Sequence, residues 1–63
     1  MNKVKILYNV LQDIDFVLSN VKTYSDTSIY GIASELCASR EYNNKHEELF
    51  YLQNFYNLIT KII

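Results

Sequence analysis

The sequence predicts an all-α fold, a small three-helix bundle that forms a single domain over residues 1–63 and pairs into a helical homodimer. Two observations predict the helices: apolar residues recur at α-helical spacing in two long stretches, and clusters of polar capping residues separate three segments. The third observation is size, because 63 residues with 49% hydrophobic side chains lie near the lower limit for folding on one core. One cysteine cannot form an internal disulfide, so helix packing and self-association are the expected sources of stability.

Residues 3–22 are predicted to form the first helix. At about 100° per residue, the apolar side chains from Val4 to Val21 fall in one sector of roughly 160°. The opposite side is polar and includes Asp13 and Asp15, which we expect to be solvated. The apolar sector is wider than the stripe of roughly 100° that covers one core, so we expect this helix to contact more than one neighbour.

A second helix is predicted over residues 26–39, with Ser25 or Asp26 as its N-cap. Its apolar residues recur at the spacing of one helical face: Ile29, Ile32, Ala33, Leu36 and Cys37. Arg40 falls in the middle of that face, so the helix is expected to end near Ser39. Cys37 is expected to be a buried packing residue, because a free cysteine behaves as a small hydrophobic side chain.

Residues 45–62 are predicted to form the third helix. Asn44 is expected to cap its N-terminus, and Glu47 to reach back to the cap as in a capping box. From Leu49 onward the apolar side chains cover a sector of roughly 180°. His46 falls in the first turn, where we expect it to be exposed to solvent.

The composition indicates a protein that works by contact and not by catalysis. The formal net charge is −1, which does not favour nucleic acid as a partner, because such proteins carry a basic face. One histidine and one cysteine cannot supply the four ligands of a zinc site, and one glycine cannot build a glycine-rich phosphate loop. We therefore expect no enzymatic activity, no catalytic residue, no metal and no cofactor.

The location expected from the sequence is cytoplasmic. Asn9, Gln12 and Asp13 interrupt any N-terminal apolar segment of the kind a signal peptide needs, and no uncharged run is long enough to span a bilayer. A helix lying on a membrane surface is not favoured either, since Lys61 is the only cation on the polar side of the last helix. We therefore expect no membrane partner, and a reducing compartment compatible with one free cysteine.

One segment suggests an alternative function. The pair Ile32-Ala33, Leu36 three residues later, and Ser39 where a further helix would open resemble the first helix and turn of helix-turn-helix DNA-binding proteins. The segment departs from that pattern because Cys37 stands where the turn usually has glycine.

A second departure is Asn43, which stands where the recognition helix of that family carries a buried aliphatic residue. The resemblance implies a DNA-binding transcriptional regulator in which four residues would reach bases or phosphates: Arg40, Asn43, Asn44 and Lys45. Nearby carboxylates would repel the phosphates: Glu41, Glu47 and Glu48.

Two phenylalanines interrupt the polar sides of the predicted helices. Phe16 lies on the polar side of the first helix, and Phe50 on that of the third. Because aromatic side chains are enriched at the centres of interfaces, we hypothesise that both contact a protein partner, either a second copy or another protein. Nearby tyrosines would extend this surface: Tyr8, Tyr24, Tyr30 and Tyr42.

The leading functional hypothesis is a non-enzymatic protein–protein interaction module. Abundant Ile, Asn, Lys and Tyr, with no proline and one glycine, are typical of AT-rich coding. Size and coding bias together suggest a small regulator, inhibitor or immunity-type protein of a low-GC bacterium, its phages or its plasmids.

Overall fold

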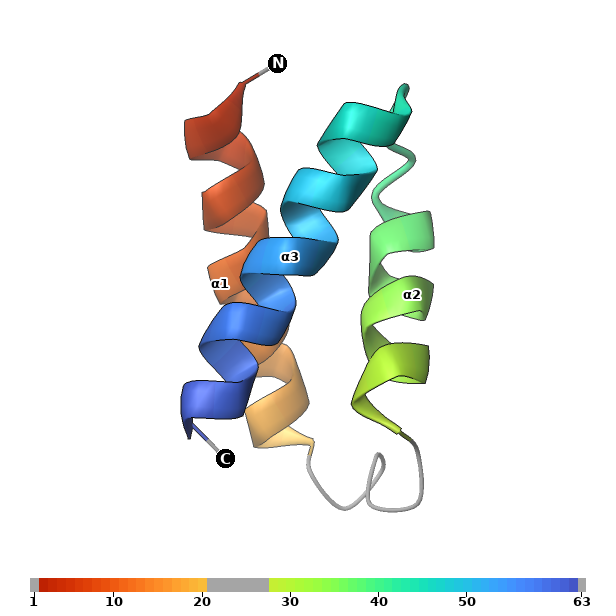
Figure 1. The fold of residues 1–63 in the computed structure, drawn as a ribbon. Helices are drawn as coiled ribbons and strands as arrows, with labels where there is room; N and C mark the ends of the chain where they lie inside the picture. The colour runs from red at the N-terminus through yellow and green to blue at the C-terminus, as the bar shows by residue number, and fades with distance from the viewer. Residues whose placement is uncertain (1, 21–27, 63) are drawn as a thin grey trace.

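The computed structural model describes residues 2–20 and 28–62, and within these ranges it contains three α-helices (Figure 1). These are α1 (Lys3–Ser19), α2 (Ile29–Ser39) and α3 (Lys45–Ile62). Figure 1 shows α3 lying across the front of the molecule between α1 and α2; α1 and α3 run in the same direction and α2 runs opposite to both. The predicted all-α, three-helix fold is confirmed, whereas the homodimer stays a prediction.

The helix boundaries follow the capping residues. The Ser28 hydroxyl accepts a hydrogen bond from the Gly31 backbone N–H at 3.1 Å, so α2 begins at Ile29 and the predicted start at residue 26 is wrong. The proposed caps Ser25 and Asp26 lie outside the described residues. At the other end α1 finishes at Ser19, short of the predicted residue 22, with Asn20 as its C-cap.

The core is built around α3, which packs against both other helices, while α1 and α2 approach each other at few points among the described residues. Each helix contributes one buried face: Ile6, Val10, Ile14 and Val17 from α1; Ile32, Ala33 and Cys37 from α2; Tyr51, Phe55 and Ile59 from α3. The burial of Cys37 and the exposure of His46 are as predicted.

The buried side of α1 is not the side that its apolar residues predict. At about 100° per residue, the centre of the buried side is rotated by about 70° from the centre of the predicted apolar sector. The rotation brings Asn9 and Asp13 into the interior and leaves Val4, Leu11 and Leu18 exposed. The prediction that Asp13 is solvated is therefore wrong, because its partners lie in α3 and in the segment between α2 and α3.

The start of α3 has the predicted cap. The Asn44 Oδ1 accepts a hydrogen bond from the Glu47 backbone N–H at 2.9 Å, and the Asn44 side-chain amide donates to the Glu47 carboxylate at 3.0 Å. The Glu47 carboxylate thus contacts the side chain of the cap. The favourable charge of Glu47 and Glu48 at the helix N-terminus adds to this arrangement.

Replacing Asn44 by alanine is expected to lower the free energy of unfolding by about 1 kcal/mol, because α3 loses the acceptor for its Glu47 N–H. Urea denaturation measures the change. The matched control is Asn43→Ala, which alters an exposed neighbour outside the helix and should shift the free energy by less than half as much. Equal losses in the two variants would contradict the assigned cap.

Candidate functional site

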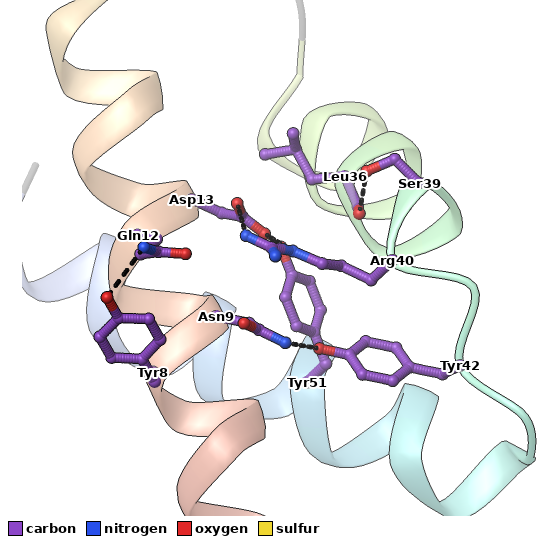
Figure 2. A network of polar contacts seen from close by, with 9 residues as sticks. All are labelled: Tyr8, Asn9, Gln12, Asp13, Leu36, Ser39, Arg40, Tyr42 and Tyr51. Carbon is purple, nitrogen blue, oxygen red and sulfur yellow. Dashed lines mark hydrogen bonds and ion pairs between the residues drawn. The ribbon is translucent and has the colours of Figure 1, made fainter.

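Five polar side chains meet between the three helices, and we refer to them as the polar cluster: Asn9, Asp13, Arg40, Tyr42 and Tyr51 (Figure 2). Asn9 and Asp13 come from α1, Tyr51 from α3, and Arg40 and Tyr42 from the segment that connects α2 to α3. Because Asn9 and Asp13 are four residues apart, both point to the same side of α1.

The Asp13 carboxylate is the centre of the polar cluster. Arg40 donates to it twice, from Nη2 to Oδ1 at 2.6 Å and from Nε to Oδ2 at 3.2 Å. The Tyr51 hydroxyl donates to the same Oδ2 at 2.5 Å. The hydrogen bond with Asp13 is the main reason why the pKa of the Arg40 guanidinium is raised above its ordinary value. Both carboxylate oxygens are therefore occupied by donors, and Asp13 is not available as a general base.

The second half of the polar cluster joins α1 to the α2–α3 connection. The Asn9 side-chain amide donates to the Tyr42 hydroxyl at 3.1 Å, and the Tyr42 ring lies 5.6 Å from the Tyr51 ring, centroid to centroid. Together with the Asp13–Arg40 ion pair, these contacts fix the rotation of α1 about its axis. Turning α1 to bury its exposed apolar residues would remove Asn9 and Asp13 from their partners.

Cys37 gives this region no reactive thiol. Burial raises the pKa of the Cys37 thiol, and the nearby charges of Glu48 and Asp13 add to the shift in the same direction. The thiolate, which is the nucleophilic form, is thereby disfavoured. The structure places Cys37 as a packing residue, as the sequence predicted.

Tyr51 makes stability depend on alkaline pH. Burial raises its pKa well above the ordinary value of about 10, and the hydrogen bond and charge of Asp13 raise it further. Above pH 10 the unfolded chain loses this proton while the folded chain keeps it, so the stabilising contribution is complete below pH 10 and is lost as pH rises.

We therefore expect the free energy of unfolding to fall above pH 10 by up to about 1.4 kcal/mol per pH unit for such a tyrosine. Urea denaturation at several pH values tests this. Tyr51→Phe should reduce the slope, leaving a part from Tyr42, whose pKa is also raised by burial. Tyr30→Phe, at a side chain that is 71% exposed, is the control. An unchanged slope in Tyr51→Phe would contradict the assignment.

On another side of α1 four large side chains form an exposed apolar stripe: Val4, Tyr8, Leu11 and Leu18. Their exposed fractions are 78%, 60%, 58% and 39%. Asp15 lies between Leu11 and Leu18 on the same side of the helix. Counted with Asp15, the residues of this side follow one another at alternating steps of four and three residues, which is the spacing of a helix that packs along another long helix. Lys3 and Lys5 lie about 100° to either side of the centre of the apolar stripe.

The two phenylalanines singled out in the sequence do not share a surface. Phe16 is 49% exposed on α1. Phe50 is half-buried against the core, with the Lys3 ammonium 5.7 Å from the centre of its ring. Lys3 and Phe16 are about 140° apart around α1, so the two phenylalanines lie on different sides of this helix. Their contact with a partner stays a prediction.

The predicted partner-binding tyrosines are also dispersed. Tyr8 lies in the apolar stripe and its hydroxyl accepts a hydrogen bond from Gln12 at 3.1 Å (Figure 2). Tyr30 is exposed on α2, with its ring 6.1 Å from that of Tyr56. Tyr42 is half-buried in the polar cluster, and Tyr24 lies outside the described residues.

Two of the four residues of the DNA-binding alternative have other structural roles. After α2 ends at Ser39, the next helix begins at Lys45, so no helix opens where the resemblance implies one. Arg40 is paired in the polar cluster, and Asn44 caps α3. Asn43 and Lys45 are exposed.

A pocket of about 200 Å³ lies between the start of α1, the α2–α3 connection and the start of α3. Its lining includes the cations of Lys5 and Arg40 and the carboxylates of Glu41 and Glu47, so its charges do not select one kind of ligand. In residues 2–20 and 28–62 no three metal-ligating side chains gather, and no described helix is both long and apolar enough to cross a membrane.

Sequence reasoning missed both the polar cluster and the apolar stripe as units. The signal for the polar cluster was Arg40 at an apolar position of the second helix, together with Asn9 and Asp13 on one side of the first. Comparison with protein families, curated proteins and solved structures finds no match to this chain.

Proposed function

We propose that the protein is a non-enzymatic protein-binding module whose contact surface is the apolar stripe of α1. The observation that carries this proposal is the exposure of Val4, Tyr8 and Leu11, each more than half accessible, on one side of a helix whose other side is the core. Contiguous apolar side chains on a surface are typical of sites that bind another protein. The even spacing along α1 fits a partner that presents a long helix.

The polar cluster supports the proposal because it makes the exposure a fixed property of the fold. Asn9 and Asp13 hold α1 in a rotation that the apolar residues alone would not choose. A buried carboxylate without its donors costs more free energy than exposed apolar side chains cost, so the helix does not turn to cover the apolar stripe. A partner molecule is then the means of covering it. Such a module suits a small regulator or inhibitor that acts by contact.

Replacing Leu11 by aspartate is expected to abolish association, because a charge then lies at the centre of the apolar stripe. Cells that make the tagged protein are treated with a membrane-permeant cross-linker before lysis, so that a reversible complex survives dilution, and the extract is run through size exclusion. Wild type should elute at a larger apparent mass than one tagged chain, and Leu11→Asp at the apparent mass of one tagged chain. Gln53→Asp, which places the same charge at an exposed position of α3, should elute like wild type. Identical elution of wild type and Leu11→Asp would contradict the proposal.

A further inference from the structure

The charges beside the apolar stripe indicate what kind of molecule covers it. Lys3 and Lys5 lie about 100° to either side of the centre of its N-terminal half, with the Lys3 ammonium 5.7 Å from the centre of the Phe50 ring. Asp15 lies within its C-terminal half. The Asp13 carboxylate is already paired inside the molecule, so Asp15 is the carboxylate of α1 that faces solvent. One end of the apolar stripe is thus cationic and the other end is anionic.

Resting on the proposed function, we infer that the apolar stripe binds the same surface of a second copy, with the two α1 helices antiparallel. In this orientation the cationic end of each helix lies against the anionic end of the other. With Val4 of one copy opposite Asp15 of the second, we expect Lys5, one residue along α1 from Val4, to pair with that carboxylate, because the Lys3 ammonium lies over the Phe50 ring. The same register places Tyr8 opposite Leu11 of the second copy, and the two-fold axis repeats both pairs.

A parallel pairing in register has the opposite electrostatics. It would place Asp15 opposite Asp15 of the second copy and bring the lysines of both copies together at one end. Like charges in contact across an interface are destabilising and select against that orientation. The arrangement of charge along α1 therefore selects the antiparallel pair.

The length of the apolar stripe sets the expected strength of the pair. From Val4 to Leu18 it extends about 21 Å at 1.5 Å per residue. One helix side of that length is small beside the interfaces of obligate dimers. The dimer is accordingly reversible and its population depends on concentration.

Cysteine cross-linking tests the orientation in purified full-length protein in which Cys37 is replaced by alanine. Val4→Cys and Leu18→Cys chains are mixed and treated with a short bismaleimide linker. In the antiparallel register Val4 and Leu18 of the second copy are about 5 Å apart along the axis, whereas two Val4 positions are about 16 Å apart and two Leu18 positions about 25 Å. The expected product joins one chain of each kind.

Products that join like chains would overturn the antiparallel arrangement. No product in any mixture would overturn the inference that a second copy is the partner. If no cross-linked product forms but wild type and Leu11→Asp still elute differently from the cell extract, the proposed function holds and the partner is another protein. Gln53→Cys, on the exposed side of α3, controls for random collision.

Charge exchange is an independent test. Lys5→Glu alone and Asp15→Lys alone should each weaken dimerisation on the order of tenfold, since the two-fold axis repeats each altered contact. Both changes in one chain should restore the dimer, because the exchanged charges at positions 5 and 15 again attract each other across the interface. A double variant as weak as the single variants would contradict the antiparallel register. Both side chains are exposed, so the fold itself is expected to be unaffected.

Discussion

Replacing Asp13 by asparagine is expected to lower the free energy of unfolding by about 2–4 kcal/mol. The change removes the charge that pairs with Arg40 and directs an N–H group at the donors of Arg40 and Tyr51. Removing one partner of a fully buried ion pair costs about 3–5 kcal/mol. The loss expected here is about 1 kcal/mol smaller, because the Arg40 side chain is 28% exposed. Chemical denaturation followed by circular dichroism measures the loss.

The size of this effect is large for such a chain. A domain of this length is expected to have a total stability of about 3–9 kcal/mol, so Asp13→Asn is expected to populate the unfolded state measurably. The control is Asp15→Asn, the same substitution two residues along α1 at an exposed position. It should change the free energy of unfolding by less than about 0.5 kcal/mol. Similar losses in the two variants would show that Asp13 is solvated and that the polar cluster does not form.

Replacing Phe55 by alanine is expected to lower the free energy of unfolding by about 3–5 kcal/mol. Phe55 is fully buried in the middle of α3, and its ring stacks against that of Tyr51 with centroids 5.8 Å apart. Truncation leaves a cavity in the core that α3 shares with both other helices. The Tyr51 ring also loses the surface that supports its hydrogen bond to Asp13.

The matched control for Phe55 is Leu49→Ala on the same helix, at a side chain that is 54% exposed. It should cost less than about 1 kcal/mol. Thermal denaturation of both variants at one protein concentration makes the comparison. Equal shifts of the melting temperature would mean that the core is not centred on α3.

The helices follow from local rules that a sequence displays. Asn44 and Glu47 mark the start of α3, and the apolar spacing identifies each helix without knowledge of its neighbours. The start of α2 was misplaced because several capping residues precede it, and the structure selects Ser28.

The rotation of α1 could not be predicted in the same way. The spacing of apolar residues shows which side of a single helix is most hydrophobic. Which side of α1 is buried depends also on polar partners from distant parts of the chain. Arg40 and Tyr51 lie 27 and 38 residues from Asp13, and no helical projection relates them. Arg40 on an apolar face indicates that an acidic partner is buried with it, but the choice between Asp13 and Asp15 requires the packed helices.

The candidate site was identified from the sequence only in part. Tyr8 was named as a partner-binding residue, and it lies in the apolar stripe. Val4, Leu11 and Leu18 were assigned to the apolar sector that packs the core, because their spacing does not distinguish them from Ile6 or Val10. Their exposure is a consequence of the polar cluster and becomes visible only when that cluster is in place.

Sedimentation equilibrium of the purified wild-type chain, from micromolar to millimolar concentration, tests most directly whether the exposed side of α1 binds a second copy. The weight-average mass should rise from 7.4 kDa towards twice that value and then level off. Leu11→Asp should remain at 7.4 kDa over the same range. A wild-type mass that stays at that of one chain throughout would contradict self-association through the apolar stripe.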